Sequence, residues 1–169
     1  QDFNHPLSCQ PSRGKIVGGN KADKIPAGFA LQTGIKDKSL MGLDPATGEA
    51  RWAVSSDIIN SQTPQATKFN GEDVLLACGG RKLIGVNPKN GEIHFEIEHG
   101  GGNGSAMTPV PIGDDTYLLT LDDLFSKAFK LAQTTDGGID CTETWKTNSI
   151  KNTYNIPCLC DESIFAYST

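Results

Sequence analysis

The sequence predicts an all-β protein, a partial β-propeller of about three to four four-stranded antiparallel blades. Two observations carry this prediction: a repeat of about 45 residues, and short apolar segments separated by turns rich in Gly, Pro and Asn. In addition, apolar residues rarely follow the 3.6-residue spacing of an amphipathic helix. A β-sandwich also contains short strands at regular intervals, but it does not explain a turn that recurs at a fixed distance.

The repeat is clearest in two segments that lie 43 residues apart. Residues 40–54 have the sequence LMGLDPATGEARWAV, and residues 83–97 have the sequence LIGVNPKNGEIHFEI. The identical pairs are Leu40/Leu83, Gly42/Gly85, Pro45/Pro88, Gly48/Gly91 and Glu49/Glu92. A weaker third copy covers residues 129–146, where Trp145 takes the place of Trp52 after a longer loop.

A second set of repeated positions marks the start of each unit. Thr63-Pro64, Thr108-Pro109 and Ile156-Pro157 follow one another at spacings of 45 and 48 residues. Each is followed by a short strand, a polar turn and an apolar run. The unit boundaries predict blades at about 12–54, 63–98, 108–147 and 156–169, the last one incomplete and the first one irregular.

One unit is expected to be a meander of four strands. The predicted strands are Gln65–Phe69, Val74–Cys78, Lys82–Asn87 and Glu92–Ile97. Pro88 fixes φ in the third turn, and Asn90-Gly91 supplies the positive φ that a tight turn needs. Strands of this length joined by such turns form blades when they stack radially.

The repeated residues have structural explanations. Large rings on the outermost strand can pack between adjacent blades, an acidic or amide side chain can hydrogen-bond the turn that it opens, and glycine supplies turn backbone. We assign these structural roles to the following positions: Asp44, Pro45, Gly48, Trp52, Asn87, Pro88, Gly91, Phe95 and Trp145.

Composition excludes some partners. The chain has 169 residues, 37% hydrophobic residues and a net charge of −5. This acidic balance argues against nucleic acid, which requires a surplus of Lys and Arg, and no apolar run approaches the roughly 20 residues of a transmembrane helix. The odd number of cysteines allows one or two disulfides and leaves at least one thiol unpaired within this chain. The sequence does not determine which of them pair: Cys9, Cys78, Cys141, Cys158 and Cys160.

Several patterns suggest chemistry, but each has a simpler explanation. Cys158 and Cys160 share one face of a strand, which suits a metal pair or redox thiols, yet we favour two buried core thiols. His94 aligns with the polar Arg51 and is expected to be solvated. The glycine run 100–105 lacks the Gly-Lys-Ser/Thr of a phosphate loop, and the acidic pairs lack the spacing of a calcium loop. We therefore predict no catalytic residue and no metal site.

Three residues are candidates for a binding rim. His99 directly precedes the glycine run, Asn103 begins an Asn-Gly-Ser glycosylation acceptor, and Tyr154 lies in the polar segment 148–155. We expect these segments to connect one blade with the next, where they can contact a partner.

The segment LDPATGEARW (residues 43–52) resembles the repeat of the pyrroloquinoline-quinone-like (quinoprotein-type) β-propellers. Residues 99–110 and 142–157 are most similar to uncharacterised bacterial propellers that are themselves similar to the outer-membrane protein assembly lipoprotein. The resemblance covers residues 28–169. It implies a periplasmic or cell-envelope protein without a cofactor, a scaffold or binding module whose rim contacts a protein or envelope component.

The same resemblance leaves an enzyme open as the alternative. Pyrroloquinoline-quinone (PQQ)-dependent dehydrogenases, which oxidise alcohols or sugars, require a carboxylate base, calcium ligands and an aromatic floor under the quinone. The alcohol-oxidising relatives also carry a vicinal Cys-Cys disulfide, which this chain lacks. A sensor propeller attached to another domain, such as a kinase, is a third hypothesis.

The length fits an incomplete ring. At about 45 residues a blade, the chain provides about three and a half blades, whereas closed propellers have 4 to 8. We expect a portion of a longer propeller, with the remaining blades supplied by the rest of the chain or by self-association. Because open sheet edges and apolar faces promote association, the chain alone is expected to self-associate or aggregate.

Overall fold

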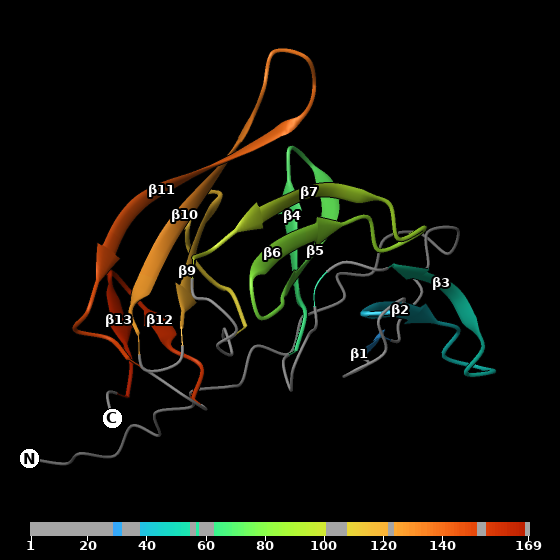
Figure 1. Ribbon diagram of the computed structural model, residues 1–169, viewed down its shortest axis with the longest axis horizontal. Coiled ribbons are helices and arrows are strands. Elements are labelled where there is room, and N and C mark those ends of the chain that lie inside the picture. Colours follow the sequence, from blue (N-terminus) through green and yellow to red (C-terminus); the bar gives the residue numbers. More distant parts are fainter. Residues whose placement is uncertain are drawn as a thin grey trace, which may run out of the picture.

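The computed structural model describes residues 29–31, 38–54, 57, 63–100, 108–121, 124–151 and 155–167. Every regular element in these ranges is a β-strand, and all strand pairs are antiparallel (Figure 1). Over the same ranges, no helix has the length and apolar character needed to cross a membrane. The predicted all-β class is confirmed.

The strands form four sheets whose order follows the sequence. The first sheet contains β1 (Phe29–Leu31), β2 (Leu40–Leu43) and β3 (Ala50–Val54). The second contains β4 (Gln65–Phe69), β5 (Glu72–Cys78), β6 (Lys82–Val86) and β7 (Ile93–Glu98). The third contains β8 (Val110–Gly113), β9 (Thr116–Thr120), β10 (Ser126–Gln133) and β11 (Ile139–Thr147). The last pair is β12 (Cys158–Cys160) and β13 (Ser163–Phe165).

Strand register follows the sequence repeat. Gly42 pairs with Trp52 between β2 and β3, Gly85 pairs with Phe95 between β6 and β7, and Ala128 pairs with Trp145 between β10 and β11. A shift in register follows directly after each of these pairs. The three aromatic residues therefore occupy one equivalent position on the last strand of their sheets.

The turn between β2 and β3 and the turn between β6 and β7 share one geometry. The side chain of Asp44 accepts a hydrogen bond from the amide of Ala46 at 2.8 Å, and that of Asn87 accepts one from Lys89 at 2.9 Å. Gly48 and Gly91 close the two turns with φ of 74° and 76°. Their amides donate to the carbonyl oxygens of Asp44 and Asn87 at 2.7 and 2.8 Å. Glycine is required at these positions because other residues are strained at such φ values.

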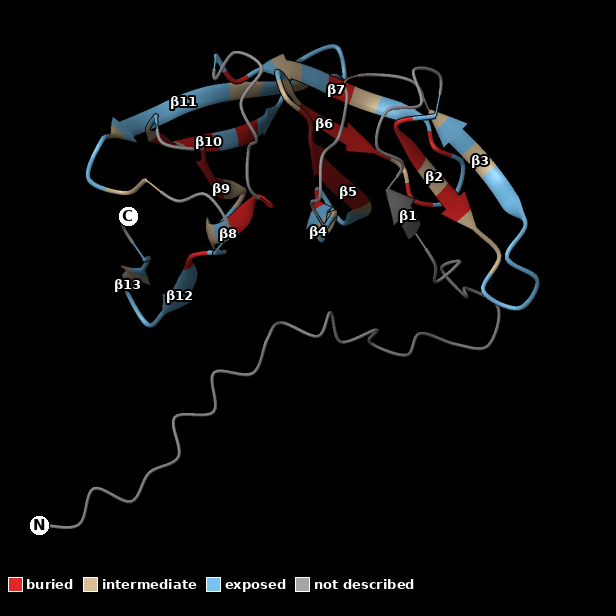
Figure 2. Ribbon diagram, turned by 60° about the horizontal axis from the view of Figure 1, so that its bottom comes forward, coloured by how far each residue is buried: buried red, intermediate tan, exposed pale blue. Residues whose placement is uncertain are grey.

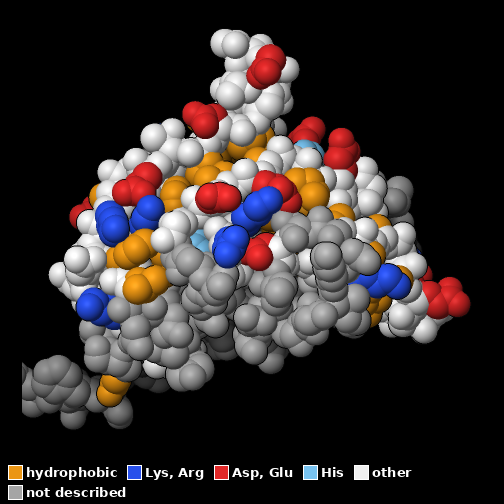
Figure 3. Space-filling model, viewed as in Figure 1, with side chains coloured by type: hydrophobic (Ala, Val, Ile, Leu, Met, Phe, Trp, Pro, Cys, Tyr) orange, Lys and Arg blue, Asp and Glu red, His pale blue; other side chains and the backbone are white. Residues whose placement is uncertain are grey.

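The turn between β10 and β11 has a different geometry. It connects the two longest strands, β10 and β11 (Figure 1), and it is closed by a hydrogen bond of 3.0 Å from the amide of Thr134 to the carbonyl oxygen of Gly138. Asp136 and Asp140 lie on this hairpin, and Figure 3 shows acidic side chains on the projecting part of the surface. The hairpin extends past the neighbouring sheet and forms one side of the site described below.

The core lies between successive sheets. The middle strands β5, β6 and β9 are largely buried, whereas the outer strands β3, β7 and β11 are largely exposed (Figure 2). One cluster joins the first sheet to the second: Leu40, Leu75, Ala77, Ile84 and Val86, with Trp52 and Val54 against it. A larger cluster joins the second sheet to the third, and includes Phe69, Leu76, Phe95, Tyr117 and Phe129. Each sheet thus buries its apolar residues against the next one, which defines a partial β-propeller.

Polar contacts join the second and third sheets near the start of each unit. The hydroxyl of Thr108 donates to the carbonyl oxygen of Thr63 at 2.9 Å and accepts from its amide at 3.3 Å. These are the threonines of the repeated Thr-Pro openings. The hydroxyls of Thr67 on β4 and Tyr117 on β9 lie 2.7 Å apart.

The prediction that Cys158 and Cys160 are core thiols is wrong for the structure, because both are exposed. Their strand β12 pairs only with β13 within the described residues, and most residues of both strands are exposed. Cys78 and Cys141 are free as well, and burial raises the pKa of both thiols, to about 12 for Cys141. Cys9 and the irregular start of the first predicted blade, residues 12–28, lie outside the described ranges.

Candidate functional site: a cavity between two sheets

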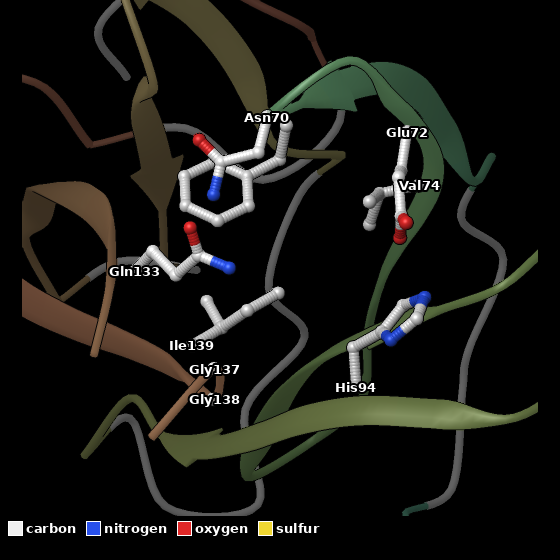
Figure 4. Close-up of a pocket in the computed structure, with 9 residues that line it drawn as sticks. Asn70, Glu72, Val74, His94, Gln133, Gly137, Gly138 and Ile139 are labelled. Carbon is white, nitrogen blue, oxygen red and sulfur yellow. The ribbon is translucent and has the colours of Figure 1, made fainter. Parts of the chain in front are cut away.

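A cavity of about 310 Å³ lies between the β4–β7 sheet and the β10–β11 hairpin (Figure 4). The turn between β4 and β5, the start of β7 and the turn end of the β10–β11 hairpin form its walls. The residues that line it are Phe69, Asn70, Glu72, Val74, His94, Gln133, Gly137, Gly138 and Ile139. The volume suits a small polar molecule or one or two side chains of a protein partner.

Two side-chain amides face one part of the cavity. Asn70 is the first residue of the β4–β5 turn and has a φ of 50°, a left-handed conformation that asparagine tolerates. Gln133 is the last residue of β10. Figure 4 shows the two amides turned toward each other from opposite walls, above Ile139. Each amide offers donors and an acceptor to a ligand.

The other part of the cavity contains Glu72 and His94. Figure 4 shows both side chains on the same side, with Val74 beside them. The Nε2 atom of His94 is buried and has no hydrogen-bond partner. The prediction of a solvated His94 is therefore wrong. His94 shares its repeat position with the exposed Arg51, but a long hairpin of the next sheet covers it.

The unpaired nitrogen is the most informative feature of the site. A buried polar atom without a partner costs about 1–3 kcal/mol, and such atoms are rare in native structures. A ligand group that supplies a donor or acceptor to Nε2 of His94 removes this cost. The cavity therefore combines one unsatisfied nitrogen, one carboxylate and two amides with the apolar surface of Phe69 and Ile139.

This arrangement suits hydrogen bonding to a ligand that carries both donors and acceptors. In the described part of the chain, no group of three or more His, Cys, Asp or Glu side chains is arranged to hold a metal ion.

The candidate rim residue His99 lies at the opposite end of the β4–β7 sheet, after β7. It is fully buried, and its Nε2 lies 3.0 Å from the carbonyl oxygen of Gly79. Its amide donates to the carbonyl oxygen of Arg81 at 2.9 Å. Burial is the main reason why the pKa of His99 is lowered. The ring thus holds the β5–β6 turn and does not face a ligand at the surface.

Asp57 binds the same turn from the other side. Its carboxylate accepts hydrogen bonds from the amides of Arg81 and Lys82, the latter at 2.8 Å. A Cβ atom at Gly79 would lie only 2.7 Å from the Asp57 side chain, so that glycine is needed for the approach. The other two candidate rim residues, Asn103 and Tyr154, lie outside the described residues.

The three repeated aromatic residues differ in their surroundings. The indole Nε1 of Trp52 donates to the carbonyl oxygen of Pro88 in the next sheet at 3.0 Å. Phe95 lies over Gly85 and is buried in the core. Trp145 is 38% exposed.

Sequence reasoning missed the cavity because its residues come from different repeat units. The sequence marks Asn70 and Glu72 only as residues of the polar turn that follows the first strand of their unit, and nothing in the local sequence marks Gln133. The longer loop of the third copy was the one available signal, since additional residues between two repeated strands must project somewhere. What they project over depends on the neighbouring sheet.

The successive antiparallel sheets and their shared turns define the class of this protein, an all-β chain of partial β-propeller architecture. No family model matches the chain, and no curated protein matches it. Among solved structures, the chain is similar to the crystal structure of BamB from Moraxella catarrhalis, with 13% sequence identity and a TM-score of 0.39. The alignment covers 85% of this chain and 57% of BamB, so the chain spans little more than half of that protein's length.

Proposed function

We propose that this chain is a non-catalytic β-propeller scaffold or binding module of the bacterial cell envelope. The single observation that supports binding is the unpaired, buried Nε2 of His94 in a cavity that also carries Glu72, Asn70 and Gln133. A partner whose backbone or polar side chain enters the cavity satisfies this nitrogen. The envelope location rests on the resemblance of residues 43–52 to the quinoprotein-type repeat.

The residues that carry this resemblance also support a scaffold. Asp44 and Asn87 hydrogen-bond within their turns, and Trp52 joins two sheets through Pro88. These contacts hold the turns and sheets in place, and none of the three residues lines the cavity. We therefore infer that the ligand of this protein is selected by the cavity and not by the repeat.

The proposal can be tested by crosslinking in cells of the source organism. A photo-reactive amino acid is placed at Asn70 or Gln133 in the full-length protein, and at the exposed Lys130 as a control. The expected result is a defined adduct with one envelope protein from both cavity positions but not from Lys130, in the membrane or periplasmic fraction. Equal adducts from all three positions, or a cytosolic protein, would contradict the proposal.

A second assay tests for the dehydrogenase. Pyrroloquinoline quinone and calcium are added to the purified full-length protein, which is then desalted. We expect no quinone absorbance to remain and no dye reduction with alcohols or aldoses. Retained quinone together with substrate-dependent dye reduction would overturn the scaffold proposal in favour of the enzyme.

A further inference from the structure

The polar side chains of the cavity have one property in common, because each of them can accept a hydrogen bond. The carboxylate of Glu72 has two acceptor oxygens, and the amides of Asn70 and Gln133 have one acceptor oxygen each. The unpaired Nε2 of His94 is an acceptor when the ring proton is on Nδ1. Two oxygens, two more oxygens and one nitrogen make five acceptor atoms that the cavity walls offer to a ligand.

The two strongest of these acceptors are not engaged by the described part of the chain. The Nε2 atom of His94 is buried without a hydrogen-bond partner. The Glu72 carboxylate forms no ion pair and no hydrogen bond with another described residue. The adjacent Asp73, by contrast, is paired with Lys68 at 2.7 Å. Within the described ranges, Glu72 therefore carries a negative charge that no Lys or Arg balances.

The alternation of side chains along β4 and β5 explains the difference between the two acidic residues. Phe69 is paired with Glu72 across the two strands, and Lys68 is paired with Asp73. Because successive side chains of a strand point to opposite faces, the Lys68–Asp73 ion pair lies on the face away from the cavity. Neither of its residues lines the cavity, and no Lys or Arg is among the residues that do. Glu72 is thus available to a cationic ligand.

The charge around the cavity selects against an anion. A carboxylate or phosphate group that enters it meets the carboxylate of Glu72, and like charges repel. Asp136 and Asp140 add negative charge on the hairpin that forms one wall, and Figure 3 shows acidic side chains on this projecting part of the surface. A cationic group is therefore attracted both at contact and during its approach.

Donor number and shape favour a guanidinium group over an ammonium group. Figure 4 shows the two amides in one part of the cavity, and the carboxylate and the imidazole ring in the other. A guanidinium group presents five N–H donors in a flat fork, whereas an ammonium group presents three donors from one point. The fork reaches more of these separated acceptors at once. Its flat faces are weakly hydrated and suit the apolar surface of Phe69 and Ile139.

We propose that the cavity binds the guanidinium group of an arginine side chain that belongs to the partner protein. This inference rests on the proposed function, which supplies the partner, and it adds the chemistry of the group that enters. Glu72 supplies the counter-charge, and Nε2 of His94 accepts one N–H. The amide oxygens of Asn70 and Gln133 accept further N–H groups from the same fork.

The test is a titration of the purified, ¹⁵N-labelled full-length protein with three blocked tripeptides: Gly-Arg-Gly, Gly-Lys-Gly and Gly-citrulline-Gly. Citrulline has the shape of arginine without its charge. The readout is the Nε2 resonance of His94, which is assigned by its loss in His94→Gln. The arginine peptide is expected to move this resonance in the direction of a nitrogen that accepts a hydrogen bond. It is also expected to bind about tenfold more tightly than either of the other peptides.

Two variants test the charge of the site. Glu72→Gln keeps the shape of the side chain and removes its charge, so it is expected to weaken binding of the arginine peptide about tenfold. Gln133→Glu adds a second carboxylate and is expected to strengthen binding. The control Glu49→Gln makes the same change of charge at an exposed residue of the turn between β2 and β3, outside the cavity, and should leave binding unchanged. Equal binding of the three peptides, a His94 resonance that does not move, or equal effects of Glu72→Gln and Glu49→Gln would each overturn the inference.

The source of the guanidinium group is tested on the partner protein that is crosslinked from positions 70 and 133. Its arginines near the adduct are changed to lysine one at a time, and one such change is expected to abolish both adducts. Adducts that survive every change would overturn the inference and leave the scaffold proposal intact. Preference for the arginine peptide without any adduct would exclude a protein as the source of the group, and would contradict the proposed function with it.

Discussion

Substitution of Gly91 by alanine tests the contact between Trp52 and the Asn87–Gly91 turn of the next sheet. Gly91 has a φ of 76°, and a Cβ atom there would lie 2.6 Å from the Trp52 ring. The substitution therefore has two effects: backbone strain, and displacement of the ring. Gly71→Ala is the matched control, because Gly71 has a φ of 80° and nothing within 4 Å of its Cβ position.

The magnitudes of the two effects can be separated. An alanine in left-handed backbone costs roughly 1–2 kcal/mol, and this applies to both variants. Overpacking against the ring costs roughly 1–3 kcal/mol, and loss of the bond from Trp52 to Pro88 costs about 1 kcal/mol. The free energy of unfolding is thus expected to fall by about 2–4 kcal/mol more for Gly91→Ala than for Gly71→Ala.

The assay is urea unfolding followed by tryptophan fluorescence. The chain has two tryptophans, so the series is made in a Trp145→Phe background, where Trp52 alone reports. Gly91→Ala is expected to shift the native emission of Trp52 to longer wavelength, since the ring becomes more exposed, whereas Gly71→Ala leaves the emission unchanged. Equal losses of stability in the two variants, with unchanged emission, would show that Trp52 is not seated on the turn.

Three further predictions follow from buried polar groups. Burial lowers the pKa of His99 in the folded state, so the unfolded state binds more protons. The free energy of unfolding is therefore expected to fall as the pH drops below about 6.5. Urea titrations of His99→Gln should lack this decrease. Tyr117→Phe removes one partner of the hydroxyl pair with Thr67 and should cost about 1 kcal/mol, and a double-mutant cycle with Thr67→Val that shows no coupling would exclude this bond. His94→Leu removes the unpaired Nε2 and should leave the free energy of unfolding unchanged or raise it by about 1 kcal/mol, whereas a large loss would mean that the nitrogen is paired in the native protein.

The strands and turns within one repeat unit were predictable from sequence. The predicted strand Gln65–Phe69 coincides with β4, and the third predicted strand differs from β6 only at its end. These elements depend on local chemistry, on alternating apolar residues and on the turn requirements of Pro88 and Gly91. Local rules of this kind act wherever the same residues recur.

Contacts between units were much less predictable. His94 and Arg51 hold the same repeat position, but only His94 is covered by the hairpin that contains Gln133. Cys158 and Cys160 were expected in a core, but both are exposed. A repeat alignment assigns each residue to a strand and a face. It does not report which surface faces that residue from the adjacent unit.

The three aromatic positions show why the adjacent unit decides. Trp52 faces a turn that offers a carbonyl oxygen at Pro88, and the indole nitrogen finds its partner there. Phe95 needs no hydrogen-bond acceptor, and it faces a sheet whose turn is built differently, with Thr134 in place of the Asp or Asn. Trp145 also carries an indole N–H, but it is 38% exposed, where water can accept its hydrogen bond. The choice of Trp or Phe at this position is therefore expected to follow the turn of the next sheet, with Trp where that turn offers an acceptor and Phe where it does not.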